Sequence, residues 1–159
     1  MTKEYITHDS KETQELGKIL AEELRGGEVI CLSGDLGAGK TTFTQGLLKG
    51  LGVKGPYTSP TFLIIKQYHI APDMKRKTNT KKILKVPWHR FYDIYHIDAY
   101  RVGAEDVSNL GWQEIISTDK NVTIIEWADR VRDIIPSDAL WINFKWLDEK
   151  KRKIIFNSK

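Results

Sequence analysis

Apolar residues recur every third or fourth position early in the chain, at Leu16, Ile19, Leu20 and Leu24. This spacing predicts an amphipathic helix. Asp9 is a typical N-cap residue, and Glu12 completes a capping-box pattern three positions later. The pair Gly26-Gly27 ends the pattern, as expected just beyond a helix.

Short runs of β-branched and aromatic residues predict strands at about 28–33, 61–68, 91–100 and 122–125. Helical patterns predict helices at about 42–52, 104–110, 112–117 and 128–135. This alternation is typical of an α/β domain. Two last runs, 140–147 and 153–156, flank Asp148-Glu149-Lys150 and predict a C-terminal β-hairpin. Hairpin strands are antiparallel, so we expect a mixed, mostly parallel sheet flanked by helices.

The segment between the first strand and its helix reads Gly34-Asp35-Leu36-Gly37-Ala38-Gly39-Lys40-Thr41. It fits G-x-x-x-x-G-K-[ST], the phosphate-binding loop of P-loop NTPases, and it lies between a strand and a helix as that motif requires. Over residues 1–159 we therefore expect one P-loop domain with a three-layer sandwich. The alternative is a glycine-rich turn without a ligand.

In such a loop, glycines let successive backbone N–H groups surround phosphate oxygens at a helix N-terminus. Lys40 should reach the β- and γ-phosphates, and the Thr41 hydroxyl should ligate Mg²⁺. The expected nucleotide contacts are Asp35, Leu36, Gly37, Ala38, Gly39, Lys40, Thr41 and Thr42.

Composition is ordinary for a soluble globular protein. The one cysteine, Cys31, lies in a predicted strand, so no internal disulfide forms and we expect a small buried side chain. No apolar run approaches the roughly 20 residues that cross a membrane. The first residues have no signal-peptide pattern, so we expect a cytoplasmic protein.

The net charge of +4 is unevenly distributed. Residues 74–90 carry seven lysines and arginines and no acid, whereas the remaining chain carries 18 basic and 21 acidic residues. We interpret about 69–90 as a basic loop insertion. It is either a solvated excursion or a contact to a phosphate backbone such as that of tRNA, made through Lys75–Arg90. Trp88, His89, Phe91 and Tyr92 would supply stacking groups for such a contact.

Two acidic residues follow predicted strands. Glu126 ends the apolar run 122–125, the usual position of a magnesium-binding acid, and Asp98 ends the run 91–100. We expect Glu126 to hold Mg²⁺ and Asp98 to hold Mg²⁺ or to position water. The alternatives are a solvent-facing carboxylate for Glu126 and a turn or N-cap aspartate for Asp98.

Other residues near these positions are less decisive. Thr61 either senses the γ-phosphate or is an ordinary loop threonine, and Trp127 is either core or partner surface. His96 is more typical of a packed residue than of a base. No N-K-x-D segment selects guanine, which favours adenine.

Four motifs together resemble the TsaE (YjeE) family: the loop with its continuation Gly34–Phe43, Ser59–Phe62, His96–Arg101 and Ile125–Trp127. The resemblance covers nearly the whole chain. It implies the ATPase component of bacterial synthesis of threonylcarbamoyladenosine at adenosine 37 of tRNAs reading ANN codons. Such a protein works with TsaD and TsaB, has low activity alone, and hydrolyses ATP to reset the TsaD–TsaB complex without transferring the threonylcarbamoyl group.

The resemblance also assigns roles to residues. It assigns Lys40 and the loop backbone to the phosphates, and Thr41 and Glu126 to Mg²⁺, and it makes Asp98 important for hydrolysis. Ser10, Thr13 and Arg152 would lie by the base or ribose. The basic insertion is longer than the family pattern, and no arginine finger is evident among Arg101, Arg130 and Arg132.

Two other functions remain open from the residues alone. One is a small-molecule kinase of P-loop fold, which would need an acceptor pocket. The other is a nucleotide-gated binding module without turnover.

Overall fold

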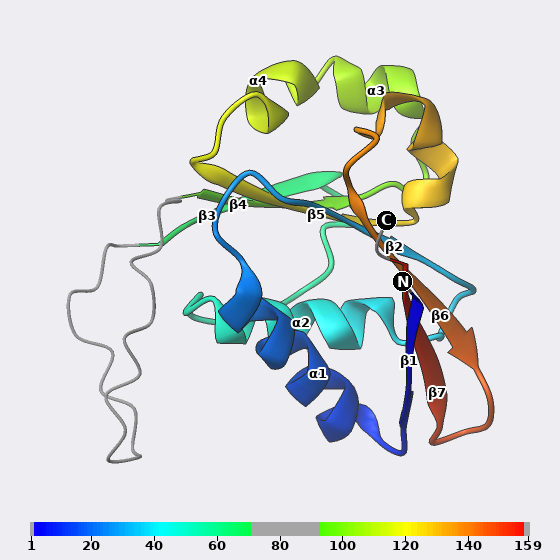
Figure 1. Ribbon diagram of the computed structural model, residues 1–159. Helices are drawn as coiled ribbons and strands as arrows, with labels where there is room; N and C mark the ends of the chain where they lie inside the picture. The colour runs from blue at the N-terminus through cyan, green and yellow to red at the C-terminus, as the bar shows by residue number, and fades with distance from the viewer. Residues whose placement is uncertain (1, 71–92, 158–159) are drawn as a thin grey trace, which may run out of the picture.

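A computed structural model describes residues 2–70 and 93–157 of the chain. Seven strands form one sheet in the order β1-β7-β6-β2-β5-β4-β3 (Figure 1). The strands are β1 (Thr2–Thr7), β2 (Val29–Ser33), β3 (Ile65–His69), β4 (Asp93–Asp98), β5 (Asn121–Glu126), β6 (Leu140–Trp146) and β7 (Arg152–Asn157). The helices are α1 (Ser10–Glu23), α2 (Lys40–Gly50), α3 (Ala104–Ser108), α4 (Trp112–Ile116) and the 3₁₀ helix η1 (Ala128–Ile134).

The sheet is mixed, as the sequence predicts. The four central strands β6, β2, β5 and β4 pair in parallel, whereas β3, β7 and β1 pair antiparallel with their neighbours. Strands β2 and β5 are buried along their whole length, which explains their nearly continuous apolar sequences. The C-terminal hairpin is formed by β6 and β7.

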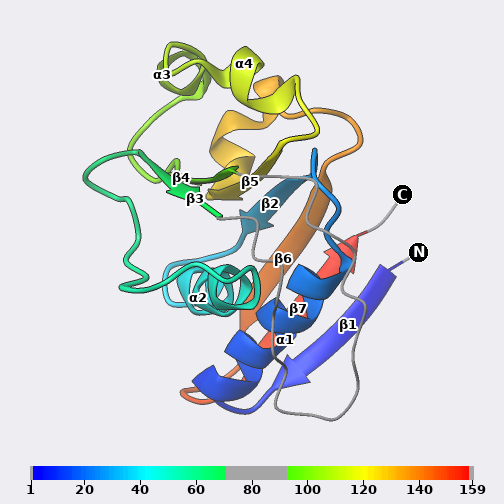
Figure 2. The ribbon, with the colours of Figure 1, turned by 90° about the vertical axis from the view of Figure 1, so that its left-hand side faces the viewer.

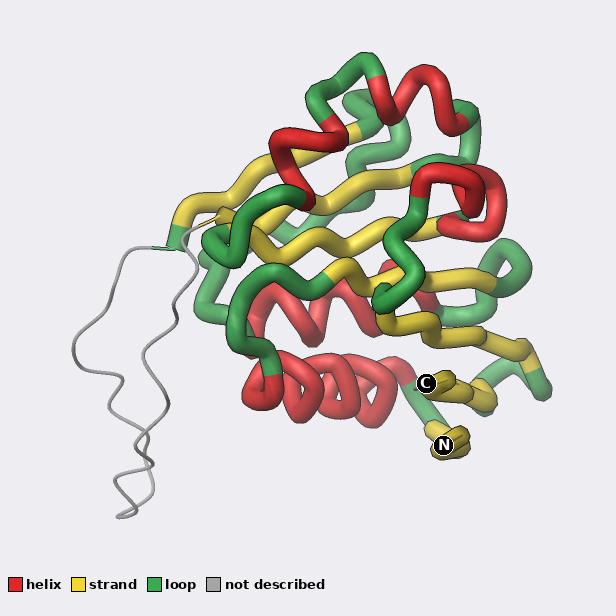
Figure 3. Tube along the Cα trace, turned by 45° about the horizontal axis from the view of Figure 1, so that its top comes forward, coloured by secondary structure: helices red, strands yellow, loops and turns green. Residues whose placement is uncertain are grey.

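Helices cover both faces of the sheet and complete a three-layer sandwich. Helices α1 and α2 lie on one face, and α3, α4 and η1 lie on the other (Figures 1 and 3). The first interface has Phe43, Leu47 and Phe144 in its core. The second contains Trp112, Val131 and Cys31. The predicted fold class is therefore confirmed.

Glycines bring α1 and α2 into close contact. A Cβ atom on Gly46 would lie 1.9 Å from the backbone oxygen of Gln14, and one on Gly17 would lie 2.4 Å from that of Phe43. Backbone therefore packs directly on backbone between the two helices, with no room for a methyl group. Figure 2 shows α1 beside α2, with β1 and β7 next to α1.

One strand was missed and two local predictions need correction. Strand β1 was not predicted because it is an exposed edge strand with little apolar alternation. It pairs antiparallel with β7. The strand expected at 61–68 begins only at Ile65, because residues 61–63 form a turn and Ile64 has a left-handed φ of 63°. The helix expected at 128–135 is a 3₁₀ helix with a non-helical residue at Val131.

The N-terminal cap of α1 also differs in detail. The Asp9 side chain accepts a hydrogen bond from the Glu12 N–H, as expected, but the Glu12 carboxylate accepts from the N–H of His8 and not of Asp9. The basic insertion at about 69–90, including Lys75–Arg90, lies almost wholly outside the described residues. Within the described ranges, no helix is long and apolar enough to cross a membrane.

Replacing Gly46 by alanine tests the packing of α1 on α2. Alanine is favoured over glycine inside a helix by about 1 kcal/mol. The clash with Gln14 nevertheless predicts that Gly46→Ala lowers the free energy of unfolding by about 1–3 kcal/mol. Chemical denaturation measures this, and Lys49→Ala, exposed on the same helix, should change it by less than about 0.5 kcal/mol. A neutral or stabilising Gly46→Ala would contradict the packing.

The Cys31 thiol should be unreactive in the folded protein. Cys31 is fully buried, and burial raises its pKa to about 12. At pH 8 only about one thiol in 10⁴ would then be ionised, and only the thiolate reacts. An aromatic disulfide reagent should modify no thiol in the native protein and one equivalent in guanidinium chloride. Rapid modification under native conditions would show that β2 is accessible.

Candidate functional site

The loop between β2 and α2 curls at the carboxyl end of the central strand. Gly34 and Gly39 both have a positive φ, 133° and 105°. A Cβ atom on Gly34 would lie 2.2 Å from the backbone oxygen of Phe144 in β6. Gly39 is the left-handed N-cap residue from which α2 begins at Lys40. The loop therefore brings the N-terminus of α2 to the carboxyl ends of the parallel strands, where α/β proteins bind ligands.

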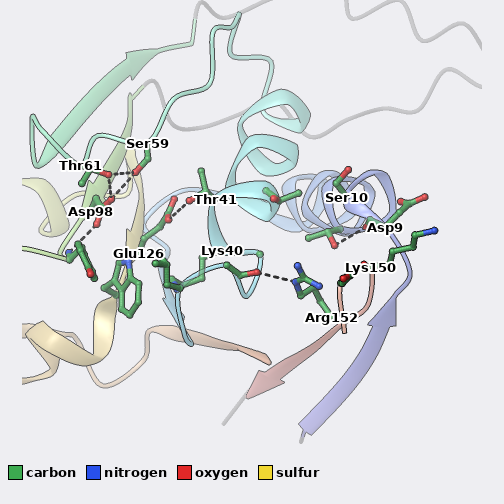
Figure 4. Close-up of a pocket in the computed structure, with 18 of the residues that line it drawn as sticks. Asp9, Ser10, Lys40, Thr41, Ser59, Thr61, Asp98, Glu126, Lys150 and Arg152 are labelled. Atoms are coloured by element: carbon green, nitrogen blue, oxygen red, sulfur yellow. Dashed lines mark hydrogen bonds between the residues drawn. The ribbon is translucent and has the colours of Figure 1, made fainter. Parts of the chain in front are cut away.

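A cavity of about 810 Å³ adjoins this loop (Figure 4). Most of the site residues expected from the sequence line it: Ser10, Thr13, Leu36, Gly37, Gly39, Lys40, Thr41, Thr42, Thr61, Asp98, Glu126 and Arg152. Asp35 and Ala38 do not. Ala38 is fully buried, and its N–H donates to the Asp35 carbonyl. This hydrogen bond stabilises the turn of the loop on the side away from the cavity.

Lys40 is almost completely buried and points back along the loop. Its ammonium donates to the carbonyl oxygens of Gly34 and, at 2.9 Å, of Asp35. The same ammonium lies 3.7 Å from the centre of the Trp127 ring. Burial lowers the pKa of Lys40, whereas nearby carboxylates, first Glu126, oppose that shift. The loop carbonyls and the aromatic face hold a desolvated cation beside the loop.

Glu126 connects α2 with the sheet. Its Oε2 accepts a hydrogen bond from the Thr41 hydroxyl at 2.7 Å, and its Oε1 lies 2.9 Å from Nε2 of His96. Glu126 is the last residue of β5, and the parallel register sets it opposite Asp98, the last residue of β4. Both acids predicted at strand ends therefore lie at the same edge of the sheet.

Asp98 forms the centre of a second group of hydrogen bonds. Its Oδ2 accepts from the hydroxyls of Ser59 and Thr61, both at 2.7 Å, and its Oδ1 accepts from the Tyr100 N–H at 2.9 Å. Figure 4 shows Ser59 and Thr61 converging on this carboxylate. We call Ser59, Thr61 and Asp98 the Asp98 cluster. It ties the loop before β3 to the end of β4.

Trp127 has an unusual backbone. Its φ is 60°, and a bulky side chain in the left-handed region is strained. This conformation directs the ring over Lys40, and the Tyr100 ring lies 4.9 Å away between centres. Trp127 therefore contacts Lys40, whereas the sequence left its place undecided between core and partner surface.

At its opposite end the cavity is lined by residues of α1 and of the C-terminal hairpin. Arg152 donates from Nε to the Gly37 carbonyl at 3.1 Å and from Nη1 to the Asp148 carbonyl at 2.6 Å. Thr13 lines the cavity too, but its buried hydroxyl contacts that of Thr7 at 2.7 Å. Ser10, at the start of α1, lies at the same end of the cavity as Lys150 and Arg152 of the hairpin (Figure 4).

Sequence reasoning missed several lining residues: His8, Asp9, Ser59, Tyr100, Trp127, Glu149 and Lys150. Ser59, Tyr100 and Trp127 lie within the motifs that carry the family resemblance, and this is the signal that could have found them. The others come from the start of α1 and from the hairpin tip. Their proximity depends on the strand order, in which β1, β7 and β6 lead from one edge towards β2.

The donor set suits a magnesium ion. Mg²⁺ prefers oxygen ligands, and proteins hold it through one or two carboxylates with phosphates and water. The Thr41 hydroxyl and the Glu126 carboxylate supply such oxygens 2.7 Å apart, and Asp98 adds a carboxylate at the neighbouring strand end. Among the described residues there is no cluster of three or more histidine, cysteine or acidic side chains that could hold a metal. This sparse set fits an ion completed by a substrate.

None of the three arginines considered as fingers lines the cavity. Arg101 lies 5.6 Å from the centre of the Phe62 ring, and Arg132 lies 4.4 Å from that of Trp141. Arg130 packs behind two lining residues: it donates to the Tyr100 carbonyl at 2.8 Å, and its guanidinium lies 5.2 Å and 5.6 Å from the ring centres of Tyr100 and Trp127. Of the arginines in the described chain, only Arg152 lines the cavity.

Comparisons with known proteins agree along the whole chain. Residues 7–154 match the family model described as "Threonylcarbamoyl adenosine biosynthesis protein TsaE". Proteins named tRNA threonylcarbamoyladenosine biosynthesis protein TsaE are similar over most of their length. The one from Bacillus subtilis is 34% identical over 154 residues, covering 96% of this chain and 83% of the relative. The one from Aquifex aeolicus is 35% identical over 156 residues, covering 97% and 95%.

A solved structure is similar as well. The crystal structure of YdiB from Bacillus subtilis superposes with a TM-score of 0.70 and is 28% identical in sequence. The match covers 99% of this chain and 86% of that chain.

Removing the Asp98 carboxylate should loosen the loop before β3. Hydrogen bonds to a charged group contribute about 1.5–3 kcal/mol each, so Asp98→Ala should speed amide exchange at Leu63 and Ile65 at least about tenfold. Amides of β5 should be unaffected, and Asp106→Ala on α3 is the matched control. Unchanged exchange near Leu63 would show that other contacts hold this loop.

Proposed function

The chain belongs to the TsaE family, and from this premise we propose that it is a P-loop ATPase that supports threonylcarbamoyladenosine formation in tRNA. The observation that carries the proposal is the convergence of Lys40, Thr41, Glu126 and the Asp98 cluster on one cavity at the P-loop. ATP would be the substrate and Mg²⁺ the cofactor.

The phosphate end of ATP would occupy the loop side of the cavity. Backbone N–H groups at the start of α2 and the Lys40 ammonium would neutralise the phosphate charge, which is most of what phosphoryl transfer requires from a protein. When ATP binds, the Lys40 ammonium would exchange its hydrogen bonds to the Gly34 and Asp35 carbonyls for hydrogen bonds to phosphate oxygens. Thr41 and Glu126 would hold Mg²⁺, which supplies charge neutralisation at the phosphates.

Asp98 would orient the attacking water. Its carboxylate is an acceptor at the strand end beside Glu126, and the hydroxyls of Ser59 and Thr61 fix its direction. Thr61 would sense the γ-phosphate through this contact. The adenosine end would lie towards Ser10, Thr13 and Arg152, where α1 and the hairpin form the other wall.

Partner proteins would complete the enzyme. We propose that TsaD and TsaB activate hydrolysis and that the isolated chain hydrolyses ATP slowly. Arg130 adjoins the cavity through Tyr100 and Trp127 without lining it, so a partner would supply the catalytic cation or move Arg130 into place. We also propose a tRNA contact through Lys75–Arg90. This part of the proposal rests on the positive charge of that segment.

Phosphate release measures the proposed activity directly. We expect slow release from ATP and Mg²⁺ with the protein alone and a large rise with TsaD and TsaB from the same organism. Lys40→Ala should reduce the stimulated rate by about 10²–10³, because it removes a cation from the developing phosphate charge. Lys49→Ala, another lysine of α2 that is exposed, should retain the full rate.

Further outcomes separate the proposal from its alternatives. Glu126→Ala should lose hydrolysis while retaining much of the nucleotide binding; normal hydrolysis in this variant would refute the metal assignment. A phosphorylated small molecule would indicate a kinase. Tight ATP binding without phosphate release, even with both partners, would indicate a nucleotide-gated binding module.

A further inference from the structure

The buried contact between His96 and Glu126 has no role in the reaction proposed above. His96 lies on β4, two residues before Asp98, and its Nε2 is 2.9 Å from Oε1 of Glu126. Both side chains are only 2% exposed. An ionised carboxylate can only accept hydrogen bonds, so Nε2 of His96 donates to Oε1. This contact and the Thr41 contact engage the two carboxylate oxygens separately.

The sheet register makes this contact a fixed feature. His96 pairs with Ile124 on β5, and Asp98 pairs with Glu126. His96 and Glu126 are therefore diagonal neighbours on the same face of adjacent parallel strands. The imidazole approaches Glu126 from within the sheet, whereas Thr41 approaches it from the first turn of α2.

The other side of the imidazole is not engaged. Among the described residues, Nδ1 of His96 is buried without a hydrogen-bond partner. A histidine that served only to join core elements would be expected to use both nitrogens, because a buried polar atom without a partner is unfavourable. The polar contact that His96 makes is directed to Glu126, a carboxylate expected at the metal.

We infer that His96 is a positioning residue that holds the Glu126 carboxylate in the orientation required to bind a magnesium ion. The N–H of His96 occupies Oε1 and leaves Oε2, on the Thr41 side, to face the metal. Hydrogen bonds to a ligating carboxylate fix its orientation and contribute to metal affinity in other proteins. The inference rests on the proposed function, because it takes Glu126 as a metal ligand.

Metal binding, measured without turnover, tests the inference. The full-length protein is saturated with a non-hydrolysable ATP analogue and titrated with Mg²⁺ by calorimetry, or with Mn²⁺ by electron paramagnetic resonance. His96→Leu removes the donor and keeps an apolar side chain, and it should weaken metal binding about 10- to 100-fold. His96→Gln, whose amide N–H can reach Oε1, should restore part of the affinity.

A structural role of His96 would give a different result. Binding of the analogue in the presence of a chelator should be the same in His96→Leu as in the wild type, because no metal is then involved. Thr123→Val is the matched control: Thr123 is a buried polar residue of β5 on the opposite face of the sheet. It should leave metal affinity unchanged.

Three results would overturn the inference. The first is an unchanged metal affinity in His96→Leu, and the second is an equal loss of analogue binding with and without metal. The third needs no variant: ¹⁵N spectra of the wild-type imidazole that show Nε2 without a proton. If the wild type itself shows no metal-dependent binding of the analogue, the proposed function fails instead.

Discussion

The hydrogen bonds of the Glu126 carboxylate hold the site together. A buried carboxylate is unfavourable unless hydrogen bonds compensate for the lost water. Glu126 accepts one from Thr41 at the start of α2 and one from His96 in the middle of β4. Three elements, α2, β4 and β5, are thereby fixed at one point. Together with the apolar packing of α2, these hydrogen bonds set the position of the loop after β2 relative to the strand ends.

The predictable part of the site is the part that local sequence specifies. A strand, a glycine-rich loop and a helix in immediate succession define the loop, and an acid that ends an apolar run is placed at the sheet edge. For this reason Lys40, Thr41, Asp98 and Glu126 could be located from the sequence. That Asp98 and Glu126 lie opposite each other depends on the pairing of β4 with β5, which the motifs do not state.

The residues that sequence reasoning missed depend on distant packing. The sequence of the turn before Ile65 predicts a strand, because Thr61, Phe62 and Ile65 favour β structure. In the folded protein Asp98 instead accepts hydrogen bonds from the Ser59 and Thr61 hydroxyls. These side-chain bonds compete with strand pairing. Strand β1 has no buried face of its own except at Thr7 and exists through its pairing with β7. The hydroxyl of Thr13 is directed to Thr7 by the packing of β1, which no local pattern shows.

The site combines a rigid half with a weakly held one. The loop and α2 are fixed by buried apolar packing, including the close approach of Gly46 to α1. The loop before β3, by contrast, is held by Asp98 from both sides, since the Asp98 N–H also donates to the Ile64 carbonyl at 2.8 Å. At the tip of that loop Phe62 is 87% exposed and Leu63 66% exposed, so displacing them from the body of the protein loses little apolar burial. Little buried apolar surface is typical of a segment that opens locally. The exposed tip of the loop before β3 can therefore move at a lower free-energy cost than the loop after β2 and α2, which buried packing holds.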